Sequence, residues 1–202
     1  MNRQYTLYEI YTGEADINTC IYTTTPKVDI IAGNIRLKNS DSKFTDLGKE
    51  HILENALKEL YTQYDYILID TPPTLSILTI NALTCSDDVI IPMQADIFSM
   101  QGLSQLIKQI EAVRQYTNPK IQIAGVLLTK YSERNILTRD LYKQIEKVTD
   151  ELSLKLFTST VRDAVLVKEA QAQKTNIFDL DAKSKVSKDY MNFINEYVKG
   201  DK

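Results

Sequence analysis

This 202-residue sequence has few of the residues on which compact binding motifs depend. Its two cysteines, Cys20 and Cys85, form no CxxC pair, which indicates reduced thiols rather than a zinc or redox site. No apolar run approaches the roughly 20 residues of a membrane-spanning helix, and no apolar segment near residue 1 resembles a secretory signal. The six glycines never cluster, so the sequence contains no glycine-rich phosphate loop.

The charge of the chain is close to balanced but unevenly distributed. The net charge is −3, with 43% hydrophobic and 25% charged residues, which is typical of a globular protein. Residues 1–101 carry 7 basic and 14 acidic side chains, whereas residues 102–202 carry 17 and 13. The basic second half is compatible with a surface that binds phosphate backbones, and equally with ordinary scatter of charge.

Continuous apolar runs predict strands of a parallel sheet. A strand buried on both faces reads as an unbroken apolar run, as in Tyr66–Ile69, Val89–Pro92 and Ile121–Leu128. Leu154–Phe157 and Val28–Gly33 read as shorter strands. Because helical patterns alternate with these runs, the predicted fold class is α/β, with a mostly parallel sheet flanked by helices.

Apolar spacing places helices between and after these strands. No linker or repeat interrupts the chain, so we predict one domain over residues 1–202. In the last helix an apolar stripe is accompanied by Asp189 and Glu196, which favours packing against the core over binding to a membrane. The predicted helices cover Thr6–Gly13, a segment from Leu47 to Tyr64, Met100–Val113, Asn135–Leu152 and Tyr190–Val198.

The end of the first long apolar run carries a candidate metal ligand. Asp70 follows Tyr66–Ile69, and ligands of parallel sheets bind beyond the carboxyl ends of the strands. A carboxylate there suits Mg²⁺ beside a nucleotide phosphate, although an aspartate at a strand end is also a common turn residue. Two prolines, Pro72 and Pro73, turn the chain away rigidly after Thr71.

This segment resembles the Walker B region of ParA/Soj-type partition ATPases, and further motifs of that family follow in order. The resemblance extends from about Tyr5 to Tyr197 and includes Asp96 where the family has glutamate. The matching stretches are YDYILIDTPPTLS at 64–76, TINAL at 79–83, IPMQAD at 91–96, GVLLTKY at 125–131 and VRDAVLVKEA at 161–170.

One hallmark of the resembled family is missing from these residues. Its members have a P-loop strand and a KGGVGKT-like loop before the region matched here, and they use ATP and Mg²⁺ through that loop. We therefore expect an N-terminally shortened, deviant-Walker type of P-loop NTPase fold that binds no cofactor and has no complete catalytic site. Loss of the central P-loop strand would leave its neighbouring strands unpaired, so we expect a marginal fold, direct closure of the gap, or a borrowed strand.

The resemblance also implies positions for binding residues. It places the nucleotide beside Asp70, which would also hold the metal, and against two loops. It assigns nonspecific DNA contacts to basic side chains near the ends of two strands. The implied nucleotide-binding residues are Asp70, Thr71, Pro72, Thr129, Lys130, Thr160 and Arg162, and the implied DNA-binding residues are Arg134, Arg162, Lys130 and Arg139.

Two classes of function remain open at this point. The first is a chromosome or plasmid partitioning protein that binds DNA, associates with a ParB-like partner and lies in the cytoplasm or on the nucleoid, with no membrane contact. The second is a non-catalytic interaction module that forms a homodimer, or a heterodimer with a full-length ParA-like protein. ATP binding would discriminate between them.

Overall fold

The computed structural model describes residues 5–24, 28–44, 46–74, 76–132 and 136–200. Its chain divides into two compact units, which are described separately. The first comprises residues 1–87 and 110–121, and the second comprises residues 88–109 and 122–202. Within the described residues, no helix is both long enough and apolar enough to cross a bilayer.

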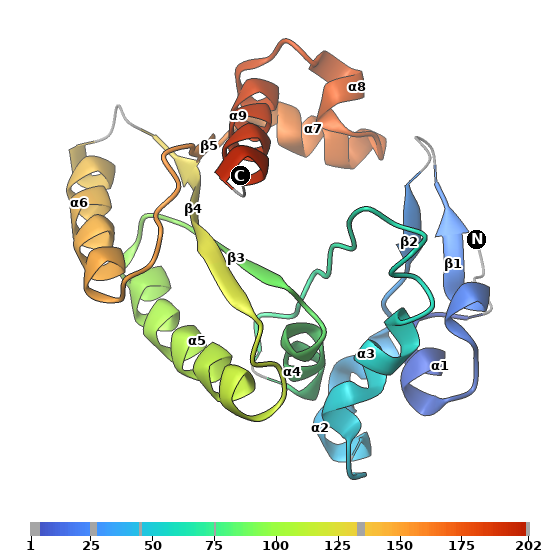
Figure 1. Ribbon diagram of the computed structural model, residues 1–202. Coiled ribbons are helices and arrows are strands. Elements are labelled where there is room, and N and C mark those ends of the chain that lie inside the picture. Colours follow the sequence, from blue (N-terminus) through green and yellow to red (C-terminus); the bar gives the residue numbers. More distant parts are fainter. Residues whose placement is uncertain (1–4, 25–27, 45, 75, 133–135, 201–202) are drawn as a thin grey trace. The chain divides into compact units, whose positions relative to one another are not determined.

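The second unit is built on a parallel sheet of three strands, as the apolar runs predict. Strand β3 (Asp88–Met93) pairs with β4 (Gln122–Tyr131), which pairs with β5 (Val161–Arg162). Helix α6 (Ile136–Glu151) and the first half of α5 (Ile97–Tyr116) lie on one side of this sheet, and α9 (Lys185–Gly200) lies on the other (Figure 1). The α/β fold class is therefore confirmed.

Gly125 allows a neighbouring segment to approach the middle of β4. Its φ of 153° belongs to a region that side chains disfavour, and the register with β3 shifts beside it. A Cβ atom at Gly125 would lie 2.8 Å from the Phe157 ring and 2.9 Å from the Lys155 carbonyl oxygen. The predicted strand Leu154–Phe157 is an isolated bridge to Val126. Close packing of this bridge therefore requires glycine.

Helix α9 covers one face of this sheet with only part of its apolar surface. Val186 is buried with Leu127, Phe157 and Val161, and three aromatic side chains of α9 pack against this cluster. The Phe193 ring meets the Phe157 ring edge-on at 5.0 Å. The three aromatic residues are Tyr190, Phe193 and Tyr197.

The first unit has a small antiparallel hairpin and a separate core. Strand β1 (Ile21–Thr23) pairs with β2 (Asp29–Ile31), so the predicted strand at Val28–Gly33 belongs to no parallel sheet. Helix α1 (Leu7–Thr12) ends at Gly13 in a left-handed conformation, as predicted. The other described elements of this unit are η1 (Ile17–Cys20), η2 (Ile35–Asn39), α2 (Ser40–Lys43), η3 (Lys49–His51), α3 (Ile52–Leu57), α4 (Ile77–Thr84) and the second half of α5.

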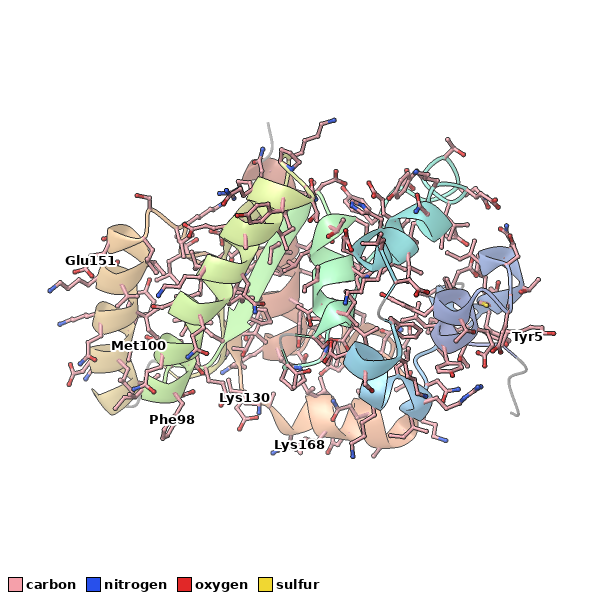
Figure 2. The ribbon with its side chains drawn as sticks, turned by 90° about the horizontal axis from the view of Figure 1, so that it is seen from below. Tyr5, Phe98, Met100, Lys130, Glu151 and Lys168 are labelled. Carbon is pink, nitrogen blue, oxygen red and sulfur yellow. The ribbon has the colours of Figure 1, made fainter. Side chains whose placement is uncertain are left out.

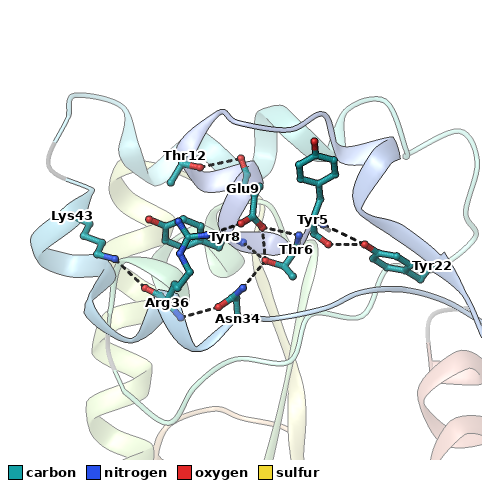
Figure 3. A network of polar contacts seen from close by, with 9 residues as sticks. All are labelled: Tyr5, Thr6, Tyr8, Glu9, Thr12, Tyr22, Asn34, Arg36 and Lys43. Carbon is teal, nitrogen blue, oxygen red and sulfur yellow. Dashed lines mark hydrogen bonds and ion pairs between the residues drawn. The ribbon is translucent and has the colours of Figure 1, made fainter. Parts of the chain in front are cut away.

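A polar network fixes the start of α1 in this unit (Figure 3). The Thr6 backbone amide and hydroxyl both donate to the Glu9 carboxylate, at 2.8 and 2.6 Å. Arg36 forms an ion pair with Glu9 at 2.9 Å, and its guanidinium lies 3.7 Å above the Tyr8 ring. The network therefore ties η2 to the N-terminus of α1, with Glu9 buried at its centre.

Asn81 joins two helical segments of the first unit. Its side chain is fully buried, and its Oδ1 accepts from the Leu53 amide at 3.0 Å. Its Nδ2 donates to the carbonyl oxygens of Lys49 and Ile77, at 2.8 and 2.9 Å. Asn81 thus connects α4 to the N-terminus of α3 and has a structural role within the motif that contains it.

The expectation of a buried strand at Tyr66–Ile69 is wrong. These residues form no strand, and among the described residues none pairs with them in a ladder. Tyr66 is 67% exposed and Leu68 is 91% exposed. An apolar run predicts burial in a sheet, but a strand forms only where neighbouring backbone groups take up its hydrogen bonds, and here they do not.

The second unit also contains short helices after β5. Helix α7 spans Val165–Gln173 and α8 spans Ile177–Asp181. The Asn176 side chain caps α8 by accepting from the Phe178 and Asp179 amides, each at 2.9 Å. Helix α9 then returns across the sheet, and the Tyr197 hydroxyl donates to Asp88 at the start of β3, at 2.9 Å.

Candidate functional site at the carboxyl edge of the sheet

The carboxyl ends of β3, β4 and β5 meet at one edge of the sheet in the second unit, where α/β folds bind ligands. Here the Thr129 hydroxyl donates to the Met93 carbonyl oxygen at 3.2 Å, which ties β4 to β3. Thr129 also faces Val161 of β5 in the parallel register. The predicted binding residues Thr129, Lys130 and Arg162 therefore lie on neighbouring strands at this edge.

Lys130 is an exposed basic residue at this edge. Its φ is 50°, in the left-handed region, because the register between β4 and β5 shifts between Thr129 and Tyr131. Tyr131 is buried, and its ring lies 5.8 Å from the ring of Tyr142 in α6. The backbone thus turns the Lys130 side chain outward. Figure 2 labels Lys130 and Phe98, both of the second unit, near one another.

Arg162 is held by an acidic side chain of α9. Its Nε lies 2.5 Å from Asp189 Oδ2, and its Nη2 lies 2.7 Å from Asp189 Oδ1. The Arg162 amide donates to the same carboxylate at 3.2 Å. The Asp189 side chain is 10% exposed and that of Arg162 is 45% exposed. Arg162 therefore fixes α9 to β5, and the charge that it presents to a ligand is reduced by Asp189.

A second acidic side chain of α9 fixes the loop that leads to Thr160. The Glu196 carboxylate accepts from the Thr158 and Ser159 amides, each at 2.8 Å. Burial raises the pKa of Glu196, but these hydrogen bonds outweigh it and the net pKa is lowered. Thr160 is half-buried behind this loop, immediately before β5.

Asp96 caps the helix that follows β3. Its carboxylate accepts from the Ser99 amide at 2.8 Å and from the Ser99 hydroxyl at 2.7 Å. The amide hydrogen bond from Ser99 is the main cause of the lowered pKa of Asp96. This side chain is therefore used in helix capping at the N-terminus of α5.

The other predicted residues lie apart from this edge or outside the described residues. Arg139 is exposed on α6, whereas Arg134 lies outside the described residues. Asp70, Thr71 and Pro72 belong to the first unit, where they are exposed and lie in no helix or strand. Within the described part of the chain, no three His, Cys, Asp or Glu side chains gather as a metal site. Metal binding by Asp70 thus stays a prediction.

Sequence reasoning missed the acids that hold this edge together. In the sequence, Asp189 and Glu196 only favour packing of the last helix against the core over binding to a membrane. Seven residues apart, they lie on the same face of a helix. Acidic side chains on a packed helix face are rarely buried without a partner, so their spacing was a signal that paired donors exist nearby.

Comparisons with known proteins identify the family of the chain. A family model described as an AAA domain matches residues 1–123, more than half of the chain. The chain is 32% identical over 200 residues to the chromosome partitioning protein ParA of Caulobacter vibrioides, covering 97% of this chain and 74% of that protein. It is 32% identical over 192 residues to the sporulation initiation inhibitor protein Soj of Bacillus subtilis, covering 94% and 75%.

A solved structure agrees with these relatives. The plasmid partition protein of Borrelia burgdorferi B31 bound to AMPPNP has a TM-score of 0.81 and is 26% identical, covering 99% of this chain and 76% of that chain. The sheet and helices described above are thus those of a P-loop NTPase fold. The chain belongs to the ParA/Soj-type partition ATPase family.

Proposed function

We propose that this protein acts in DNA partitioning as a nonspecific DNA-binding member of its family that neither binds nor hydrolyses ATP on its own. Two features carry the proposal together. The sequence has no glycine-rich phosphate loop, and the carboxyl edge of the sheet still presents Lys130. A ParB-like protein would be its partner, as expected from the family.

The DNA contact would be electrostatic. Lys130 is exposed at the end of β4 and Arg139 is exposed on α6. Arg162 is paired with Asp189, so its share of the contact would be smaller than that of Lys130. Phosphate contacts of this kind carry no sequence information and weaken steeply with salt. Location on the nucleoid would follow from such binding.

The proposed lack of nucleotide binding rests on the backbone chemistry that a triphosphate needs. P-loop enzymes hold the β- and γ-phosphates with successive backbone amides, a lysine, and a Ser or Thr hydroxyl on Mg²⁺. Here Gly102 lies inside helix α5, and Gly125 packs under Phe157. Neither glycine belongs to a turn that could surround phosphates.

Two measurements test this function. Equilibrium dialysis of the full chain with Mg-ATP should show no binding, and micromolar affinity would overturn the inactive state. Fluorescence anisotropy with a labelled duplex in the absence of ATP should show salt-dependent binding. The double substitution Lys130→Ala with Arg139→Ala should weaken it about tenfold and reduce the salt dependence. Lys108→Ala on α5 is the matched control, and an equal loss there would contradict the proposed surface.

A second candidate function is a non-catalytic module that associates with a full-length relative. The exposed residues Tyr66–Leu68 favour it, because an apolar segment that pairs with no described strand can receive a strand from another protein. Mixing the chain with a full-length ParA-like protein and measuring the mass by light scattering tests this candidate. Leu68→Lys should abolish the complex, and a complex that survives it would argue against this segment.

A further inference from the structure

The outward face of α9 bears an apolar stripe that the sheet does not cover. Met191 is 44% exposed, Ile194 is 42% exposed and Val198 is 40% exposed. Their spacings of three and four residues place them on one face of the helix. Helix α9 therefore has two apolar faces, one on the core and one turned to solvent.

The exposed charges on this helix are all positive. Lys185, Lys188 and Lys199 are exposed, and Lys188 and Lys199 lie on the same flank of the stripe by helical periodicity. The two acids of α9 point elsewhere. Asp189 binds Arg162, and Glu196 binds the Thr158 and Ser159 amides. The presence of these acids in the sequence argued against membrane contact, and their inward orientation removes that argument.

We propose that the outward face of α9, formed by Met191, Ile194 and Val198 with its flanking lysines, binds anionic lipid bilayers peripherally. A helix with apolar residues on one face and lysines beside them suits the boundary between headgroups and acyl chains. Lysine ammonium groups reach anionic headgroups while their stems lie along apolar surface. The inference is independent of the proposed DNA contact.

The geometry favours a bilayer over an acidic protein partner. The stripe lies on the convex surface of one helix, whereas a partner helix is normally received in a groove between elements. A flat, anionic, apolar-cored surface can contact all three apolar side chains and the lysine flank together. If the true partner of this face is an acidic protein, the chain will not bind the vesicles, and the test below includes that outcome.

Co-sedimentation of the full chain with vesicles measures the interaction. Vesicles of equal parts phosphatidylglycerol and phosphatidylcholine should bind the chain, and vesicles of phosphatidylcholine alone should bind it much less. Ile194→Glu should lower binding about tenfold. Val165→Glu introduces the same charge at the exposed Val165 of α7 and should leave binding unchanged. Lys188→Glu with Lys199→Glu should lower binding about tenfold, and Lys108→Glu should not.

The absence of tryptophan from the chain provides a second readout that does not depend on sedimentation. Met191→Trp places a single fluorophore in the stripe, and its emission should shift to the blue on adding the anionic vesicles. Val165→Trp should not shift. Failure to bind anionic vesicles, equal binding to neutral ones, or equal effects of Ile194→Glu and Val165→Glu would each overturn the proposal.

Discussion

Arg162 and Asp189 form a two-point ion pair that joins β5 to α9, with Nε and Nη2 of the guanidinium on the two carboxylate oxygens. The aspartate is nearly buried while the arginine is about half exposed. A residue that the family resemblance assigns to ligands therefore also holds the second unit together. Substitutions at Arg162 affect folding and binding at once, and the two effects have to be separated.

Arg162→Ala should lower the free energy of unfolding by about 2 kcal/mol, because it leaves the Asp189 carboxylate without its main partner. The exposure of the guanidinium keeps the loss below that of a fully buried pair. Adding Asp189→Asn should recover part of the loss, since no buried charge then remains. Urea unfolding followed by circular dichroism measures both, and a double variant no more stable than Arg162→Ala would argue against an electrostatic cause.

Gly125→Ala should be strongly destabilising. A methyl group there would overlap the Phe157 ring and the Lys155 carbonyl group, and φ at this position is positive. We expect a loss of about 3 kcal/mol in the free energy of unfolding. Gly102→Ala in α5 is the matched control, because a Cβ atom there would meet no described atom within 4 Å apart from its neighbours in the chain and the backbone of its own helix. The control should be neutral or stabilising, as alanine favours helix.

Asn81→Ala should destabilise the first unit by about 2–3 kcal/mol, because it leaves the Leu53 amide and two carbonyl oxygens without their partner. Asn55, exposed on α3, offers a comparison, since Asn55→Ala should change stability by no more than about 0.5 kcal/mol. Thermal melting of the two variants checks this. Equal melting temperatures would mean that Asn81 does not hold α3 and α4 together.

Glu9 should make the stability of the protein sensitive to acid. Hydrogen bonds from Thr6 lower its pKa below the usual 4.5. The folded state therefore releases this proton more readily than the unfolded chain. The resulting stabilisation is present above pH 4.5 and is lost as the pH falls through the lowered pKa of the folded state.

Glu9→Gln should reduce the acid sensitivity of unfolding measured by urea titration between neutral pH and pH values below 4.5. Some sensitivity should remain, because the pKa of Glu196 is also lowered. Glu14→Gln, at an exposed position just after α1, should keep the acid dependence of the parent chain. A pH profile unchanged by Glu9→Gln would contradict the role of the Thr6 contacts.

Helices and strands could be predicted from the sequence where their start, end or burial is determined by residues close together in the chain. Thr6 and Gly13 bracket α1 because capping chemistry acts within a few residues. The apolar runs at Val89–Pro92 and Ile121–Leu128 lie in β3 and β4, since the long helix between them supplies the crossover that parallel strands need. The prediction of one domain over residues 1–202 stays a prediction.

Structural features that depend on residues far apart in the sequence could not be predicted. The run at Tyr66–Ile69 has strand character, but its state depends on neighbours that no local pattern specifies. The stripe of α9 was interpreted as one core-facing surface, whereas Phe193 packs inward and Ile194 is exposed. The binding roles that the resemblance implies for Lys130 and Arg162 stay predictions. No local pattern could reveal that Arg162 is paired with Asp189.

The exposure of Tyr66, Ile67 and Leu68 affects how the purified protein behaves in solution. Short, uncharged, β-prone stretches that are exposed promote intermolecular aggregation, and charged side chains placed within them act as gatekeepers. At high concentration, this stretch is where precipitation of the purified chain should begin. Leu68→Lys should therefore raise the soluble yield while leaving strands β3–β5 unaltered.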